Sequence, residues 1–102
     1  MKLNLLGSVA VVSAGMFSTS ALADCGKVSI TEMDWASSAV VTAVSKFLME
    51  QGYGCEVQVV PSSTVPALVS LAETGEPDLL TEVWANSTPS YEPLLAEGKL
   101  VE

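Results

Sequence analysis

Val28-Ser-Ile-Thr-Glu-Met-Asp-Trp35 is a short, strand-like run that ends in a tryptophan at a turn, and Asp78-Leu-Leu-Thr-Glu-Val-Trp84 repeats this arrangement further along the chain. In an open parallel α/β sheet, ligands bind at the carboxyl ends of the strands. We therefore expect the two indole rings to face one crevice. A pair of such rings suits a cation that has no hydrogen to donate.

Strand-like and helix-like segments alternate around these two runs. Strands are predicted over residues 27–33, 56–60 and 78–83, helices follow each of them, and Leu100-Val101 predicts the start of a further strand. Gly75 is expected to end the second helix, and Gly98 to close a short helix over 91–97. Three successive βα units predict an α/β fold, with a parallel sheet, right-handed crossovers and flanking helices.

The first helix is predicted to begin at Ser37 and Ser38, which are favourable capping residues, and to stop at Gly52. Apolar and long side chains follow at helical spacing: Val40, Val44, Phe47, Leu48 and Gln51. The second helix is predicted to follow the candidate capping residues Ser62, Ser63 and Thr64, with Pro66 in its first turn.

The first 23 residues have the composition of a secretory signal peptide. A basic residue precedes an apolar stretch over 5–17, and Ala21-Leu-Ala23 is a small-x-small cleavage signal. Cleavage between Ala23 and Asp24 would leave a domain over 24–102. A membrane-spanning helix is the alternative, but the stretch is short for a bilayer and contains several Ser and Gly residues. Lipid attachment at Cys25 is disfavoured by the acidic residue before it.

Residues 24–102 are strongly acidic. They hold all twelve acidic residues and three of the four basic ones, hence a formal charge of −9. This charge argues against nucleic acid and anionic membrane surfaces as partners. It mildly favours cationic ligands, although a soluble exported protein also explains a negative surface.

The chain has two cysteines, Cys25 and Cys55, each placed just before a predicted strand. In an oxidising compartment an even count predicts one disulfide, and the amino ends of two neighbouring parallel strands lie side by side. A catalytic or metal-binding role is the alternative. The sequence contains no His and no CxxC pair, so we favour the structural role and predict neither a metal site nor a cofactor.

A set of short motifs follows a fixed order through residues 24–102. It comprises Asp34-Trp-Ala-Ser-Ser38, Gly52-Tyr53, Gly75-x-x-Asp78, Glu82-Val-Trp84, Tyr91 and Glu97-Gly-Lys-Leu-Val101. In order and spacing these motifs resemble the amino-terminal part of the substrate-binding proteins of glycine betaine, choline and proline betaine ABC transporters. The resemblance covers about the first third of a full-length family member. The sequence stops at Glu102, just as a fourth apolar element begins with Leu100 and Val101. We therefore expect an incomplete chain.

The resemblance implies the first part of one lobe of a two-lobed periplasmic binding protein, which closes on its ligand and docks on a membrane permease. Trp35 and Trp84 match two positions of the family's aromatic cage around a quaternary ammonium group. A trimethylammonium group cannot donate a hydrogen bond, so aromatic quadrupoles are the groups that hold it. The alternative for both tryptophans is a role as core aromatics that cover a sheet edge.

Four further residues are candidate ligand contacts. Ser37 and Ser38 are first of all helix caps, but the amino end of their helix would point at the crevice and could receive a carboxylate. Asn86 and Ser87 lie in the loop after the third strand and could hydrogen-bond the ligand, although polar residues are common in such loops. Tyr91 is expected to pack or to hydrogen-bond at the start of its helix.

An enzyme and a secreted interaction module are the competing function classes. Asp34 and Glu82 flank the tryptophans and could form an acid and base pair of a hydrolase. The sequence has no nucleophile elbow, phosphate loop or zinc-ligand spacing. We therefore predict no catalytic residue and favour an exported solute-binding protein, which saturable binding of an unaltered betaine would distinguish from an enzyme.

Overall fold

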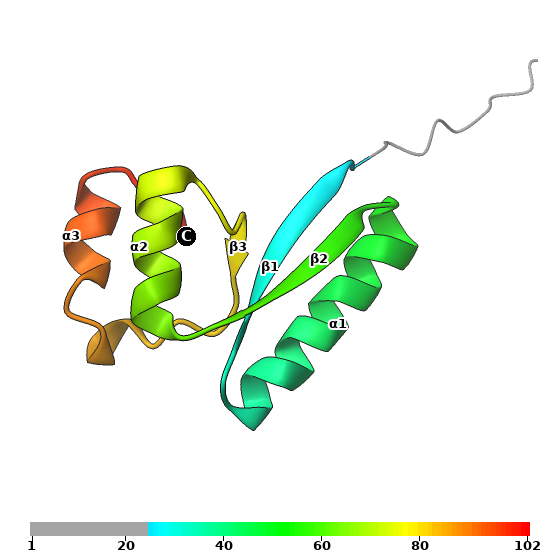
Figure 1. Ribbon diagram of the computed structural model, residues 1–102, viewed down its shortest axis with the longest axis horizontal. Helices are drawn as coiled ribbons and strands as arrows, with labels where there is room; N and C mark the ends of the chain where they lie inside the picture. Colours follow the sequence, from blue (N-terminus) through cyan, green and yellow to red (C-terminus); the bar gives the residue numbers. More distant parts are fainter. Residues whose placement is uncertain (1–24) are drawn as a thin grey trace, which may run out of the picture.

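The computed structural model describes residues 25–102, so the predicted signal peptide and its cleavage site at Ala23 and Asp24 lie outside the described residues. Strands and helices alternate along the chain (Figure 1). The elements are β1 (Lys27–Met33), α1 (Ala36–Tyr53), β2 (Glu56–Ser62), α2 (Thr64–Thr74), β3 (Leu79–Leu80), the 3-10 helix η1 (Ala85–Ser87) and α3 (Tyr91–Ala96). The predicted α/β fold with flanking helices is confirmed.

The sheet is parallel and has the strand order β2-β1-β3. β1 pairs with β2 over its whole length, from Lys27 opposite Glu56 to Met33 opposite Ser62. Its pairing with β3 is limited to Ile30 opposite Leu79 and Thr31 opposite Leu80. The first strand of the described chain is therefore the central one.

Helices lie on both sides of this sheet, with α1 on one side and α2 and α3 on the other (Figure 1). Because side chains alternate between the faces of a strand, each side has its own apolar cluster. The cluster beside α1 consists of Val28, Ile30, Met49, Cys55, Val57 and Val59. The cluster beneath α2 and α3 is built around Leu68, Tyr91 and Leu100.

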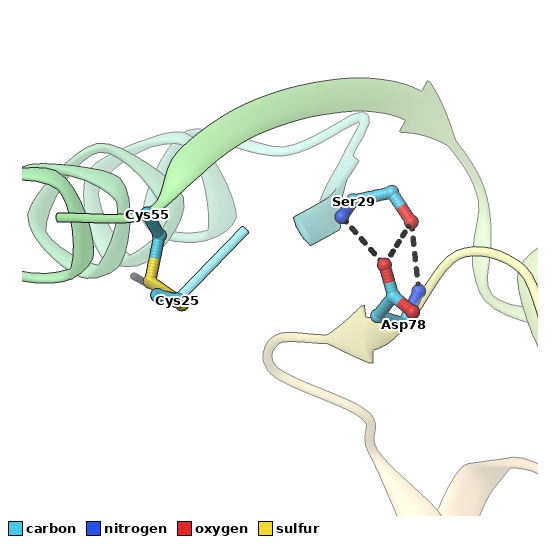
Figure 2. Close-up of a disulfide and its surroundings, with 4 residues drawn as sticks. All are labelled: Cys25, Ser29, Cys55 and Asp78. Carbon is cyan, nitrogen blue, oxygen red and sulfur yellow. Dashed lines mark hydrogen bonds between the residues drawn. A yellow bond between two sulfur atoms is a disulfide. The ribbon is translucent and has the colours of Figure 1, made fainter. Parts of the chain in front are cut away.

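A disulfide and a side-chain bridge hold the chain near the amino ends of the strands (Figure 2). Cys25 and Cys55 are joined, with their Cα atoms 4.5 Å apart, and the backbone N–H of Glu56 donates to the carbonyl of Gly26 over 2.8 Å. Ser29 and Asp78 link β1 to the segment that leads into β3. Both neighbours of β1 are thus fixed at the end opposite to the two tryptophans.

The face that α1 turns toward the sheet is polar. Its buried residues are Ser38 and Thr42, whereas apolar residues at the helical spacing noted in the sequence, such as Val40 and Phe47, are exposed. The two buried hydroxyls bond to β1: Ser38 Oγ accepts from the Met33 N–H over 2.9 Å, and Thr42 Oγ1 lies 3.2 Å from the Thr31 carbonyl. Short polar side chains let the helix approach the central strand closely enough for these bonds.

Several boundaries of helices and strands also differ from the predicted ones. α1 continues through Gly52 to Tyr53 and is capped by Gly54, which has a φ of 68°. β2 runs past Pro61 to Ser62, which an edge strand tolerates because its outer N–H groups have no ladder partner. Gly75 and Gly98 take the left-handed conformation expected of them.

The carboxyl-terminal part of the chain forms less sheet than predicted. β3 is limited to Leu79 and Leu80, because the backbone turns away at Glu82, whose φ is 57°. Leu100 and Val101 form no strand; Leu100 packs against Leu68 instead. Within residues 25–102, none of the helices combines the length and apolar character needed to cross a membrane.

Candidate functional site

The strand order creates a switch point at the carboxyl ends of β1 and β3. From β1 the chain passes through α1 to β2 on one side, and from β2 it crosses through α2 to β3 on the other side. Ligands of open α/β sheets bind where the connections diverge in this way. Trp35 follows β1 and Trp84 follows β3, so both tryptophans lie on the chain segments that flank this point.

A surface groove of about 350 Å³ brings these two tryptophans together. Besides the indole rings, its lining comes from the start of α2 and from the loop after β3: Thr64, Val65, Ser87 and Thr88. Trp84 is 61% exposed, whereas Trp35 is partly buried. The groove therefore combines two aromatic residues with three hydroxyl-bearing residues at the carboxyl edge of the sheet.

Trp35 is held by the turn between β1 and α1. It is the residue that precedes the helix, its backbone is extended (φ −133°, ψ 156°), and its carbonyl accepts from the Ala39 N–H over 3.3 Å. No side chain caps this helix end, so the expectation that Ser37 and Ser38 act as caps is wrong. The Ser38 hydroxyl instead accepts a hydrogen bond from the backbone N–H of Met33, and this bond stabilises the turn.

The ring of Trp35 leaves one polar atom without a partner. Its Nε1 is buried and has no hydrogen-bond acceptor among the described residues. An indole N–H that is buried in this way costs free energy unless a partner is supplied. The ring is therefore placed by the backbone turn and by packing rather than by its own hydrogen bond.

Trp84 is fixed through its backbone while its ring stays exposed. Its carbonyl accepts from the Ser87 N–H over 2.9 Å and from the Thr88 hydroxyl over 3.0 Å. Thr88 is buried, and its own carbonyl accepts from the Tyr91 N–H at the start of α3 over 3.0 Å. The loop that carries the second indole is therefore anchored to α3.

The two tryptophan-bearing segments are also joined to each other. The Ser37 hydroxyl donates to Glu82 Oε1 over 2.6 Å, and below this bridge the Thr81 hydroxyl donates to the carbonyl of Thr31 over 3.1 Å. Thr42 Oγ1 lies 3.0 Å from Thr81 Oγ1 and completes the hydroxyl cluster. These hydroxyl bonds link β1 to the segment after β3 at the point where the pairing of the two strands ends.

At the opposite end of the sheet, Asp78 and Ser29 bond reciprocally. Asp78 Oδ2 accepts from both the N–H and the hydroxyl of Ser29, each over 2.7 Å, and the Asp78 N–H donates to Ser29 Oγ over 2.9 Å. The backbone N–H of Ser29, and then its hydroxyl, hold the pKa of Asp78 below its ordinary value of 3.8. The ionised carboxylate thus clamps the start of β3 to β1.

This clamp gives an acid-sensitive contribution to stability. Because the pKa of Asp78 is lower in the folded than in the unfolded chain, its contribution is complete well above pH 3.8 and is lost as the pH falls through the folded pKa. We expect Asp78→Asn to flatten the pH dependence of the unfolding midpoint below pH 4, as measured by urea denaturation. An unchanged slope, with Asp34→Asn as the matched exposed control, would contradict this.

The sequence-predicted ligand contacts divide into two groups. Trp35 and Trp84 line the groove. Ser37, Ser38 and Asn86 are not among its lining residues; Ser37 bonds to Glu82, Ser38 to Met33, and Asn86 lies exposed in η1. Direct ligand contact by these three residues stays a prediction.

Of the other lining residues, Ser87 is predicted from the sequence as a candidate ligand contact, and it does line the groove. Sequence reasoning did not single out Thr64, Val65 and Thr88 as site residues. The available signal was the position of Thr64 and Val65 shortly after β2, since all three strands end at the same edge. Tyr91 lies outside the groove, as expected: it packs in the cluster around Leu68, and its hydroxyl donates to the Glu102 carboxylate, which raises the pKa of Tyr91 to about 12. Within residues 25–102, no three His, Cys, Asp or Glu side chains are grouped to hold a metal ion.

Comparison with known protein families gives a match that spans most of the chain. Residues 26–102 match the family described as the substrate binding domain of ABC-type glycine betaine transport systems. Comparison with individual curated proteins gives no match. The matched region contains β1, both tryptophans and every residue of the groove.

Proposed function

Because the chain belongs to the family of substrate-binding domains of ABC-type glycine betaine transport systems, we propose that it captures a quaternary ammonium solute between Trp35 and Trp84. The family implies a small-molecule ligand, a membrane permease as partner and an extracytoplasmic location, and its members bind rather than catalyse. The candidate ligands are glycine betaine, choline and proline betaine.

The observation that supports this proposal is the shared groove of the two indoles. Its lining contains no charged side chain, so a bound cation would be stabilised by the ring quadrupoles and by the strongly acidic chain as a whole. Each cation–π contact contributes about 0.5 to 2 kcal/mol, with the larger values where water is excluded. Aromatic faces with few polar groups favour an ammonium group whose hydrogens are replaced by methyl groups.

The remaining lining residues suit the other end of such a ligand. Thr64 and Ser87 bring hydroxyl groups to the groove, and hydroxyls can donate to a carboxylate or accept from an alcohol. Val65 adds apolar surface beside the rings. We further propose that residues 1–23 direct export, that the mature domain begins at Asp24, and that the permease receives the solute on the outer side of the membrane.

Ligand titration of the full chain tests this function. The chain contains only two tryptophans, and both line the groove, so intrinsic fluorescence reports directly on the site. We expect saturable changes with glycine betaine or choline, and affinity at least about tenfold weaker for glycine, which lacks the methyl groups that contact the rings. Equal affinity for glycine, or chemical conversion of the betaine detected by NMR, would overturn the proposal.

A further inference from the structure

The segments that carry the two tryptophans are not held together by the sheet. The pairing of β1 with β3 ends at Thr31 and Leu80, before the chain reaches either ring. Beyond that point the two segments are linked by side chains: the hydroxyl of Thr81 and the bridge between Ser37 and Glu82. The bridge is the outermost link before the groove.

The position of this bridge ties it to both rings. Ser37 comes two residues after Trp35, and Glu82 comes two residues before Trp84. At 2.6 Å between the oxygen atoms, this is a short bond from a neutral donor to a carboxylate, the class of side-chain hydrogen bond that is stronger than a neutral pair. A change in this bond therefore alters the separation of the two indoles before it alters the sheet.

Glu82 adopts a backbone conformation that its residue type disfavours. Its φ of 57° is the only positive φ of a non-glycine residue within 25–102, and left-handed backbone at such a residue persists only where the surroundings enforce it. Its second carboxylate oxygen, Oε2, is buried and has no partner among the described residues. Neither feature is explained by the stability of the fold.

From these observations we infer that Glu82 is a positioning residue, which acts through its hydrogen bond from Ser37 to hold Trp35 and Trp84 at the spacing that a quaternary ammonium group requires. This inference rests on the proposed function. Without the bridge the two segments sample other separations, and the apparent affinity falls by the fraction of chains in the competent arrangement. The loss of one such bond is expected to weaken binding about two- to tenfold.

Three variants of the full chain separate the positioning role from a structural one. Glu82→Asn keeps a residue type that tolerates left-handed backbone but is too short to reach Ser37, and Ser37→Ala removes the donor. Both are expected to raise the Kd for glycine betaine about two- to tenfold when binding is measured at a temperature at which each variant is fully folded. Glu82→Gln keeps the chain length and an acceptor oxygen, so its Kd should stay within about twofold of the parent.

The double variant of Ser37→Ala and Glu82→Asn should bind no more weakly than either single variant, because both remove the same bond. If Glu82→Gln weakens binding as strongly as Glu82→Asn while Ser37→Ala has no effect, the carboxylate acts on the cation by its charge and the inference is overturned. It is equally overturned if Glu82→Asn and Ser37→Ala both bind like the parent.

A measurement without ligand separates this inference from the proposed function. In a Trp84→Phe background only Trp35 fluoresces, and Glu82→Asn should increase its quenching by acrylamide, because the loosened segment exposes the ring. If the parent binds no quaternary ammonium compound, the proposed function fails, while increased quenching still supports the bridge as the element that places the ring. Unchanged quenching contradicts the positioning role whatever the titration shows.

Discussion

Replacement of both Cys25 and Cys55 by Ser is expected to lower the free energy of unfolding by about 3 to 4 kcal/mol. The two cysteines are 30 residues apart in sequence, and closing a loop of that size removes roughly this much conformational freedom from the unfolded chain in the chain-entropy model. A loss of that size is a large share of the stability of a small domain. Urea denaturation of the parent and the double variant measures it.

Reduction of the parent by dithiothreitol should reproduce the effect of the double variant, and the variant itself should not respond to the reductant. The disulfide lies at the amino ends of β1 and β2 (Figure 2), whereas the groove lies at the carboxyl ends. We therefore expect the folded variant to keep the ligand preference of the parent. Equal unfolding midpoints for parent and variant would show that the loop closure contributes nothing.

Replacement of either Trp35 or Trp84 by Ala is expected to weaken the binding of glycine betaine or choline by about 1 to 3 kcal/mol. The loss combines the cation–π attraction with the apolar contact of the ring. Replacement by Phe should cost less, because a smaller aromatic face remains. Isothermal titration calorimetry measures both, since a variant with a single tryptophan gives a weaker fluorescence signal.

The two positions differ in what the loss of the ring does to the fold. Trp84 is 61% exposed, so Trp84→Ala should leave the melting temperature close to that of the parent. Trp35 is partly buried, and its alanine variant should lose some stability as well. Val65→Ala, in the same groove but without an aromatic face, serves as the matched control and should weaken binding less. Parent-like affinity in both folded alanine variants would make the tryptophans structural residues.

The order of the elements could be predicted from the sequence because local signals carry it. The bounds of β1 agree with the predicted 27–33, and Gly75 and Gly98 take their left-handed positions, since a glycine after a helical run meets a purely local requirement. The placement of Trp35 and Trp84 beside one groove followed from a rule about the edge of parallel sheets. Such a rule needs only the order of strands and turns.

Three features depended on contacts that local patterns do not contain. The spacing of Val40, Val44 and Phe47 indicated a helix, but which face met β1 was decided by the bonds of Ser38 and Thr42 to that strand. The early end of β3 depends on a left-handed glutamate, which no residue preference predicts. The part of the groove that comes from Thr64 and Val65 needed the register of β2 beside β1.

The disulfide has a consequence for the order in which the molecule is assembled. A chain that emerges amino end first presents Cys55 well before Asp78 and Trp84. In an oxidising compartment, the disulfide between Cys25 and Cys55 can therefore form, and join the start of β1 to the start of β2, before the segment with the second tryptophan has emerged. The late segment then docks on the free edge of a central strand whose other edge is already paired. Vectorial emergence and oxidation would thus work in the same direction, and the recognition groove would form only after the disulfide-bonded part of the fold is in place.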